Sequence, residues 1–266
     1  MQKKIALISK NEKNMYTLFF FVILALFIIC TAYTKFNILS LISNSGNFWD
    51  FLLQDFFPPN IPKAEKLPNV FLSVITTVAM AISSTTVAGI FAFIVSLFGS
   101  EHISPFPKFA KVVRGFATFL RNIPALVWAF ILFSSLGIGT GVGFVALMIT
   151  SFAFMVRAFV ETMEEVSQDC IETLQAVGAT FPQRVVNGII PSCINGFISW
   201  FLYCIEVNIR ASTIVGMVGG GGIGLVLFSY IKGFKYSTAS SIILLIAAMV
   251  ILVDMLTGRL RKAVEK

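Results

Sequence analysis

Two opposite charges stand four residues apart in an otherwise apolar segment, at Glu206 and Arg210. Because an α-helix rotates by about 100° per residue, a helix here places both on one narrow face with other polar side chains. The full set on this face is Asn195, Ser199, Tyr203, Glu206, Arg210 and Thr213. Such a stripe could carry a hydrophilic solute past lipid, with Arg210 or its neighbours meeting an anion. The alternative is that it joins helices around a permanently paired ion pair.

The order of the two charges favours their pairing, because a glutamate four residues before an arginine is the better arrangement on a helix. The two side chains are therefore expected to neutralise each other. An unpaired arginine near the bilayer centre costs about 3 kcal/mol or more, so the pair should face the helix bundle or water. Asn208 and Ser212 fall on the opposite side of the helix and are expected to pack against neighbouring helices.

A glycine run from Gly219 to Gly224 formally matches the dinucleotide-binding pattern GxGxxG. The run follows an apolar segment rather than a strand, and the next acid, Asp254, lies in another apolar segment, so this interpretation fails. No Gly-Lys dipeptide occurs, which excludes a Walker A site for ATP. The glycines are instead expected to form a gate or a segment where backbones pack closely. They are Gly219, Gly221, Gly222 and Gly224.

The polar segment 161–191 is predicted to form a helix–glycine–helix elbow. Residues 162–177 favour a helix with one apolar side. That side consists of Met163, Val166, Cys170, Ile171, Leu174 and Val177. Gly178 should end the helix, and Thr180 with Gln183 resembles a capping box that begins another. We expect the elbow to dock on a partner; the alternative is a connector that lies on the membrane surface.

Catalytic and metal-binding patterns are missing from the sequence. No arrangement of Ser, His and Asp and no pair of carboxylates suggests catalysis, and His102 stands alone. The cysteines have neither CxxC nor metal-ligand spacing. They are Cys30, Cys170, Cys193 and Cys204. We therefore expect a protein that is not an enzyme and that has no metal site and no disulfide framework.

The composition indicates that these residues are positioned by helices in lipid. Of 266 residues, 57% are hydrophobic and only 12% are charged, and the mean hydropathy is +0.88. A single aqueous core could not hide so many apolar side chains, which excludes a soluble globule. The net charge of +7 is scattered between apolar runs, which favours membrane topology over nucleic-acid binding as its cause.

Six apolar stretches are long enough to cross a hydrocarbon core of about 30 Å, which takes about 20 helical residues. They are residues 15–34, 70–98, 116–136, 142–160, 194–218 and 239–257. We therefore predict an all-α polytopic membrane protein with six transmembrane helices. Residues 1–69 would hold an N-terminal tail, the first span and an external loop with a short interfacial helix. Residues 70–266 would form a five-helix core.

The first span could be mistaken for a signal peptide, because lysines precede it. It is too long for such a segment and no small-x-small cleavage site follows, so it is expected to remain as an anchor. With the N-terminus inside, most lysines and arginines of the loops lie on the cytoplasmic side. Both termini and segment 161–191 are therefore predicted to be cytoplasmic.

Several of these stretches resemble one family. Glu172, Gly178 and Pro191 have the spacing of the EAA motif of bacterial ABC importer permeases, with Thr173 and Leu174 in place of the usual alanines. The stretch Glu206–Gly224 resembles the signature of phosphonate-type permeases. Two further stretches, 121–129 and 56–59, are also similar to that subfamily, so the resemblance covers most of the chain after about residue 47.

The resemblance implies a methionine-permease-like ABC type I importer fold with an extra N-terminal helix. It implies a homodimer in the bacterial inner membrane, with two cytoplasmic ABC ATPases and an extracytoplasmic solute-binding protein. The chain itself would bind no cofactor, because the ATPase would bind ATP and Mg²⁺. The ATPase-coupling residues would be Asp169, Glu172, Thr173, Leu174, Ala176, Gly178 and Ala179. The translocation path would be formed by Ser199, Tyr203, Glu206, Arg210 and Thr213.

The cargo implied by the resemblance is phosphonate or a related phosphorus oxyanion, phosphate or phosphite. A permease of the same fold could instead carry methionine or another small solute. A third possibility is an ion-coupled secondary carrier in which Glu206 and Arg210 serve ion coupling.

Overall fold

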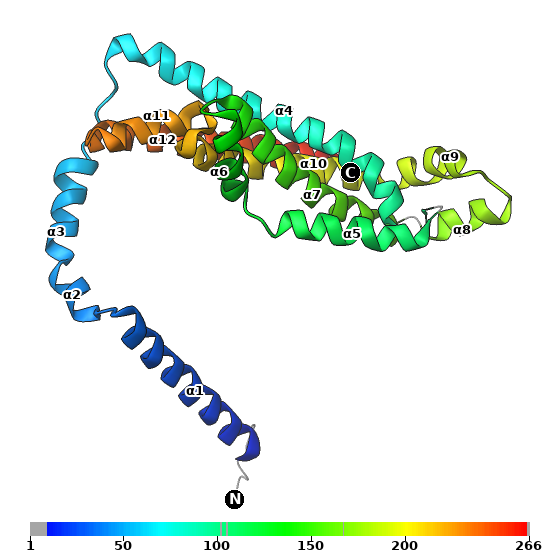
Figure 1. Cartoon of the computed structure of the whole chain (residues 1–266), viewed down its shortest axis with the longest axis horizontal. Coiled ribbons are helices and arrows are strands. Elements are labelled where there is room, and N and C mark those ends of the chain that lie inside the picture. Colours follow the sequence, from blue (N-terminus) through cyan, green and yellow to red (C-terminus); the bar gives the residue numbers. More distant parts are fainter. Residues whose placement is uncertain (1–9, 102, 105, 167, 265–266) are drawn as a thin grey trace, which may run out of the picture. The chain divides into compact units, whose positions relative to one another are not determined.

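The computed structural model describes residues 10–101, 103–104, 106–166 and 168–264, and every regular element in these ranges is helical. The expected all-α architecture is therefore confirmed. The chain divides into two compact units, residues 1–55 and residues 56–266 (Figure 1). Each unit is described by itself.

The first unit is a series of helices without a core. Helix α1 (Lys10–Thr34) has 25 residues, which at about 1.5 Å per residue gives about 38 Å, enough to cross a bilayer. None of its described side chains, residues 14–34, is buried. Short helices α2 (Ile38–Ser43) and α3 (Ser45–Asp50) follow, and a π-helical turn, η1 (Phe51–Phe56), continues α3. The predicted short helix before Pro58 is therefore present.

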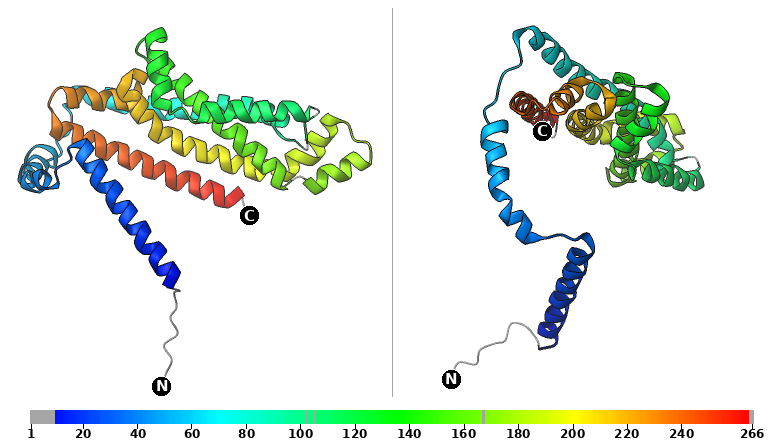
Figure 2. Two further views of the ribbon diagram at one scale, coloured as in Figure 1. Left: turned by 60° about the horizontal axis from the view of Figure 1, so that its bottom comes forward. Right: turned by 60° about the vertical axis from the view of Figure 1, so that its left-hand side comes forward.

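The second unit contains the helices that pack together. In chain order they are η2 (Ala64–Lys66), α4 (Leu67–Gly99), α5 (Pro107–Arg121), α6 (Ala125–Leu136), α7 (Thr140–Val166), α8 (Gln168–Ala176), α9 (Phe181–Arg184), η3 (Val185–Ile189), α10 (Ile190–Val215), η4 (Gly216–Gly220), α11 (Gly222–Lys232) and α12 (Tyr236–Val264). Helix α4 packs along α7, and α10 packs against α4, α7 and α12. Helices α10 and α12 run side by side in opposite directions (Figure 2).

Small side chains let these long helices approach closely. Most of the buried positions of α4 are alanine, glycine, serine or threonine, the residue types that line helix contacts in membranes. A Cβ added at Gly99 would lie 2.8 Å from a methyl carbon of Val160 on α7, so the Val160 side chain packs directly on the α4 backbone there. The core of the unit is therefore built from close helix contacts as well as from large apolar side chains.

A buried amide joins three of the helices. Asn208 of α10 is 3% exposed, and its side-chain nitrogen donates hydrogen bonds to Thr85 Oγ1 of α4 at 2.7 Å and to Ser151 Oγ of α7 at 2.5 Å. Ser212 lies one turn further along and is 1% exposed. Both residues pack between helices, as the sequence predicted.

We expect Asn208→Ala to lower the stability of the unit by about 1 kcal/mol, a typical value for an interhelical hydrogen bond in a membrane. The measurement is the melting temperature of the purified protein in detergent. Thr86→Ala is the control, because the Thr86 hydroxyl bonds only the carbonyl of Ile82 in its own helix, at 2.8 Å. Equal melting temperatures for the Asn208 variant and the wild type would contradict this role.

The third predicted span is not one helix. Helices α5 and α6 are separated by residues 122–124 and are bent by 83° relative to each other, so the expectation of a continuous helix over 116–136 is wrong. Pro124 provides the reason, because proline has no N–H and disfavours the helical conformation of the residue before it. Helix α5 also begins earlier, at Pro107.

Helices α5 and α6 nevertheless both pack against α7, α5 beside its second half and α6 near its start. Arg157, in the second half of α7, donates to the Thr118 hydroxyl of α5 at 3.3 Å. Ala129 of α6 packs in one cluster with Val142 and Ala146, near the start of α7. The pair therefore packs against both halves of α7. Among the described residues, five single helices are long and apolar enough to span a membrane, and the number is six if the bent pair is one span.

Candidate functional site

The charged face predicted on α10 is present. Glu206 and Arg210 form an ion pair, in which the Glu206 side chain is 14% exposed and the Arg210 side chain is 53% exposed. The glutamate is thus held against the helix bundle, while the arginine extends to the surface of the single chain.

A second arginine reaches the same glutamate from α12. Arg261 Nη2 lies 3.7 Å from Glu206 Oε2, and the Arg261 guanidinium lies 5.9 Å from the centre of the Tyr203 ring. The sequence indicated Arg261 only as a marker of topology. Glu206 and Arg210 form the expected pair, and Arg261 adds a second positive charge beside the same glutamate. The face carries a net charge of +1.

The remaining predicted path residues differ in how they contribute. Ser199 is half-buried one turn before Tyr203, which is 36% exposed. Thr213 is 8% exposed, and its hydroxyl donates to the Ile209 carbonyl of its own helix at 3.4 Å. The structure therefore gathers Tyr203, Glu206 and Arg210 with Arg261 into one group, and Thr213 lies outside it.

The glycine run after α10 forms a tight kink that leads into α11. Gly219, Gly221 and Gly222 have φ angles of +106°, +79° and +68°, a backbone region that other residues rarely adopt. A Cβ at Gly224 would lie 2.0 Å from the Thr213 carbonyl oxygen. Gly139 at the start of α7 donates its N–H to the Gly219 carbonyl at 2.9 Å. The geometry is that of a close-packed segment between α10 and α11.

The elbow formed by α8, α9 and the turn between them projects from one end of the helix bundle (Figure 1). One side of α8 packs on its own chain: Ile171 is 2% exposed in a cluster with Val185 and Ile189. The other side of α8 lies at the surface, with exposed Glu172, Thr173 and Ala176. The elbow therefore keeps one surface, with Glu172, Thr173 and Ala176, that is exposed in the described part of the chain.

The predicted turn of the elbow is confirmed in its local details. Gly178 has a φ of +79°, and the Ala179 N–H donates to the Leu174 carbonyl at 2.9 Å. The Thr180 N–H donates to Gln183 Oε1 at 2.8 Å, as a capping box requires. Val177, on the predicted apolar side, is 76% exposed, whereas Ile171 of the same side is buried. The side chain of Asp169 lies outside the described residues.

An ion pair anchors the start of the elbow. Arg114 of α5 pairs with Glu164 near the end of α7, and its Nε–H donates to the Gly99 carbonyl of α4 at 2.8 Å. The Glu101 N–H donates to the same Glu164 carboxylate at 3.3 Å. These contacts join α4, α5 and α7 where α8 begins, so motion of the elbow would be transmitted to three helices.

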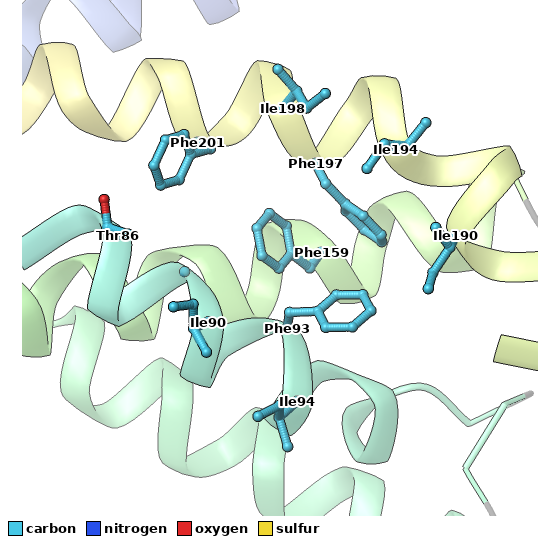
Figure 3. Close-up of a pocket in the computed structure, with 11 residues that line it drawn as sticks. Thr86, Ile90, Phe93, Ile94, Phe159, Ile190, Ile194, Phe197, Ile198 and Phe201 are labelled. Carbon is cyan, nitrogen blue, oxygen red and sulfur yellow. The ribbon is translucent and has the colours of Figure 1, made fainter. Parts of the chain in front are cut away.

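A cavity of 590 Å³ lies between α4, α7 and α10, but its lining does not suit a charged solute (Figure 3). Phenylalanine and isoleucine side chains such as Phe93, Phe159 and Ile194 point into it, and Thr86 carries its one hydroxyl group. A polar solute would lose its hydrogen bonds to water in this cavity, so the cavity is excluded as the translocation path of such a solute.

The chain belongs to the family of binding-protein-dependent transport system inner membrane components, which it matches over residues 86–266. It is therefore a multi-pass inner-membrane permease of an ABC importer, a transport subunit rather than an enzyme. In this family the ATPase and the solute-binding protein are separate partners.

Among known relatives, the phosphite transport system permease protein PtxC of Stutzerimonas stutzeri is 35% identical over 188 residues, which cover 71% of this chain and 68% of PtxC. The phosphate-import permease protein PhnE of Mycolicibacterium smegmatis is 28% identical over 79% of this chain. The matched region spans only 39% of that longer relative.

Solved structures confirm the expected fold. The inward-facing MetNI methionine ABC transporter matches 76% of this chain and 99% of its own chain, with a TM-score of 0.64 and 22% identity. An amino acid ABC transporter crystallised with histidines matches 75% of this chain and 95% of its own, with a TM-score of 0.62 and 17% identity. At these identities the likeness concerns the fold alone.

Proposed function

We propose that this chain forms the translocation path for a phosphorus oxyanion, namely phosphonate, phosphate or phosphite, delivered by a solute-binding protein. Two relatives that match 71% and 79% of the chain are named as phosphite and phosphate permeases. The working unit in this proposal is a homodimer with two ATPase subunits.

The observation that carries the cargo proposal is the excess of arginine on α10 and α12. Arg210 and Arg261 flank a single acid, Glu206, so the face has a net positive charge. Arginine suits this role because its planar guanidinium can bind two oxygens of a phosphate-like group at once. A zwitterionic amino acid would gain less from such a face, since its ammonium group would be repelled. Ser199, Tyr203 and Thr213 complete the proposed path.

The proposed orientation places both termini and the elbow on the cytoplasmic side. The distribution of lysine and arginine between the loops supports it. In this arrangement the exposed Glu172, Thr173 and Ala176 of α8 contact the ATPase, which binds ATP and Mg²⁺. Gly178 and Ala179 form the turn, and Leu174 holds α8 against its own chain. Residues 1–69 then contribute the additional span and outer loop, and residues 70–266 the transporting core.

The cognate solute-binding protein tests the cargo. We expect it to bind phosphate, phosphite or methylphosphonate in equilibrium titrations and to show no binding of methionine. Selective binding of methionine or another amino acid would remove the oxyanion proposal and favour an amino acid permease of the same fold.

We expect Arg210→Ala to lower uptake about fivefold while leaving the amount of assembled complex nearly unchanged. The physical reason is that Arg261 still compensates Glu206 after Arg210 is removed, whereas the path loses a charge exposed to solute. The measurement is uptake into proteoliposomes, normalised to the amount of complex.

Arg259→Ala is the matched control, because Arg259 is exposed on α12 and has no carboxylate within ion-pair distance among the described residues. Its uptake should equal that of the wild type. If Arg210→Ala instead reduces assembly and uptake in equal measure, Arg210 has a structural role and not the role proposed.

A further inference from the structure

A second cavity, of 270 Å³ and with some polar lining, lies at the break between α5 and α6. Its walls are the break itself, from Arg121 to Ala125, the middle of α7 and the face of α10 between Tyr203 and Ala211. At about 30 Å³ per water molecule it has room for about nine waters, more than a tetrahedral oxyanion of five heavy atoms needs. Of the predicted path residues, only Tyr203 lines it.

The charge of this cavity comes from Arg121, the last residue of α5. Its guanidinium lies 5.6 Å from the centre of the Phe154 ring, over the face of the ring. No carboxylate among the described residues is within ion-pair distance of Arg121, and no acidic residue lines the cavity. Arg121 thus differs from Arg210 and Arg261, which share Glu206.

The position of Arg121 makes its lack of an acidic partner informative. Phe154 is near the middle of α7, which runs from Thr140 to Val166, so Arg121 lies beside the middle of that helix, with its side chain exposed in the single chain. Within the hydrocarbon region an arginine would cost about 3 kcal/mol or more unless water or an anion compensated it. Broken spans with binding sites near the bilayer midplane are a recurring arrangement in transporters.

The other polar groups of the cavity are mostly occupied. Asn208 bonds Ser151 at 2.5 Å, and Thr150 donates to the Ala146 carbonyl at 3.2 Å. Tyr203 packs on the same Phe154 ring as Arg121, with ring centres 5.6 Å apart. No hydrogen bond of the Tyr203 hydroxyl is found among the described residues. The Arg121 guanidinium and the Tyr203 hydroxyl are therefore the groups left to bind a solute.

We infer that this cavity is an anion-binding site of the translocation path and that Arg121 is the residue that contacts the anion there. The inference rests on the proposed function and adds a second anion-binding site to the proposed path. Tyr203 connects this cavity with the charged face around Glu206, because it lines the cavity and also contacts Arg261. An anion leaving Arg121 would meet the net positive group around Glu206 next.

The test uses the complete complex of permease, ATPase and binding protein in proteoliposomes, supplied with ³³P-labelled inorganic phosphate, phosphite or methylphosphonate. Two quantities are measured together: anion imported, and ATP hydrolysed in response to the loaded binding protein. We expect Arg121→Gln to lower the number of anions imported per ATP about tenfold, with ATP hydrolysis and assembly within about twofold of the wild type. Arg121→Lys, which keeps the charge, should stay within about threefold.

The control is Lys111→Gln, which removes a positive charge from the exposed side of the same helix and should change neither quantity. An unchanged import ratio for Arg121→Gln would overturn the inference and leave the proposed function standing. Loss of assembly in Arg121→Gln, restored by Arg121→Lys, would also overturn it, because Arg121 would then pair with an acid of another chain. If the wild type imports none of the three anions, the proposed function itself fails.

Discussion

Replacing Gly222 by alanine is expected to prevent most of the chain from assembling into a stable transport complex. Gly222 has a φ of +68°, and a Cβ there would lie 2.4 Å from Thr77 Oγ1. That hydroxyl is buried in α4 and accepts the Ile223 N–H at 2.8 Å. The substitution therefore adds about 1–2 kcal/mol of backbone strain to about 1–3 kcal/mol for a buried N–H without its acceptor.

The measurement for Gly222→Ala is the yield and melting temperature of the complex in detergent. Gly258→Ala is the matched control, because a Cβ at Gly258 in α12 meets open space and the helix should be slightly favoured. Thr77→Val separates the lost hydrogen-bond acceptor from the backbone strain. It removes the acceptor without straining the backbone, so it should lower the stability less than Gly222→Ala does. Wild-type stability of Gly222→Ala would show that the kink after α10 does not need its left-handed backbone.

The second large effect is expected at the elbow, where Gly178→Val should lower ATP-driven uptake about thirtyfold. Gly178 has a φ of +79°, and nothing lies within 4 Å of a Cβ added there, so the penalty is confined to the backbone. A left-handed residue costs about 1–2 kcal/mol and a β-branched one more, and each 1.4 kcal/mol is a factor of ten. The strain would turn α8 away from the surface that the ATPase is proposed to contact.

Gly178→Asn provides the decisive comparison, because asparagine tolerates a left-handed backbone far better than valine does. Uptake and co-purification of the ATPase should both be largely retained in the asparagine variant and lost in the valine variant. Equal losses in both would show that the side chain rather than the backbone matters. Normal uptake in both would contradict the coupling role of the elbow.

The features predicted well from the sequence depend on local chemistry. The long apolar runs became helices because a lipid environment requires every backbone group to be bonded within its own segment. The turn at Gly178 and the cap at Thr180 formed as predicted because their hydrogen bonds join residues three to five positions apart. Neither depends on how distant helices meet.

The sequence carries two signals for the interruption between α5 and α6. Pro124 and Arg121 both stand inside an apolar run, and each alone favours an interruption. Hydropathy over a long window averages such signals away.

The tertiary environment of the arginines could not be predicted from the sequence. Arg261 follows a long apolar run, which is where a cytoplasmic topology marker is expected. Its contact with Glu206 exists because α12 runs antiparallel to α10, and this pairing joins residues 55 positions apart in the chain. Arg121 faces a cavity only because α5 and α6 bend around the middle of α7.

The most direct test of the account is uptake of ³³P-labelled phosphate, phosphite and methylphosphonate by proteoliposomes that contain this chain with its ATPase and binding protein. We predict uptake of at least one of these anions that requires both ATP and the binding protein and that stops when the ATPase is omitted. Uptake driven by an ion gradient without the ATPase, or ATP-driven uptake of methionine with none of the three anions, would contradict the account.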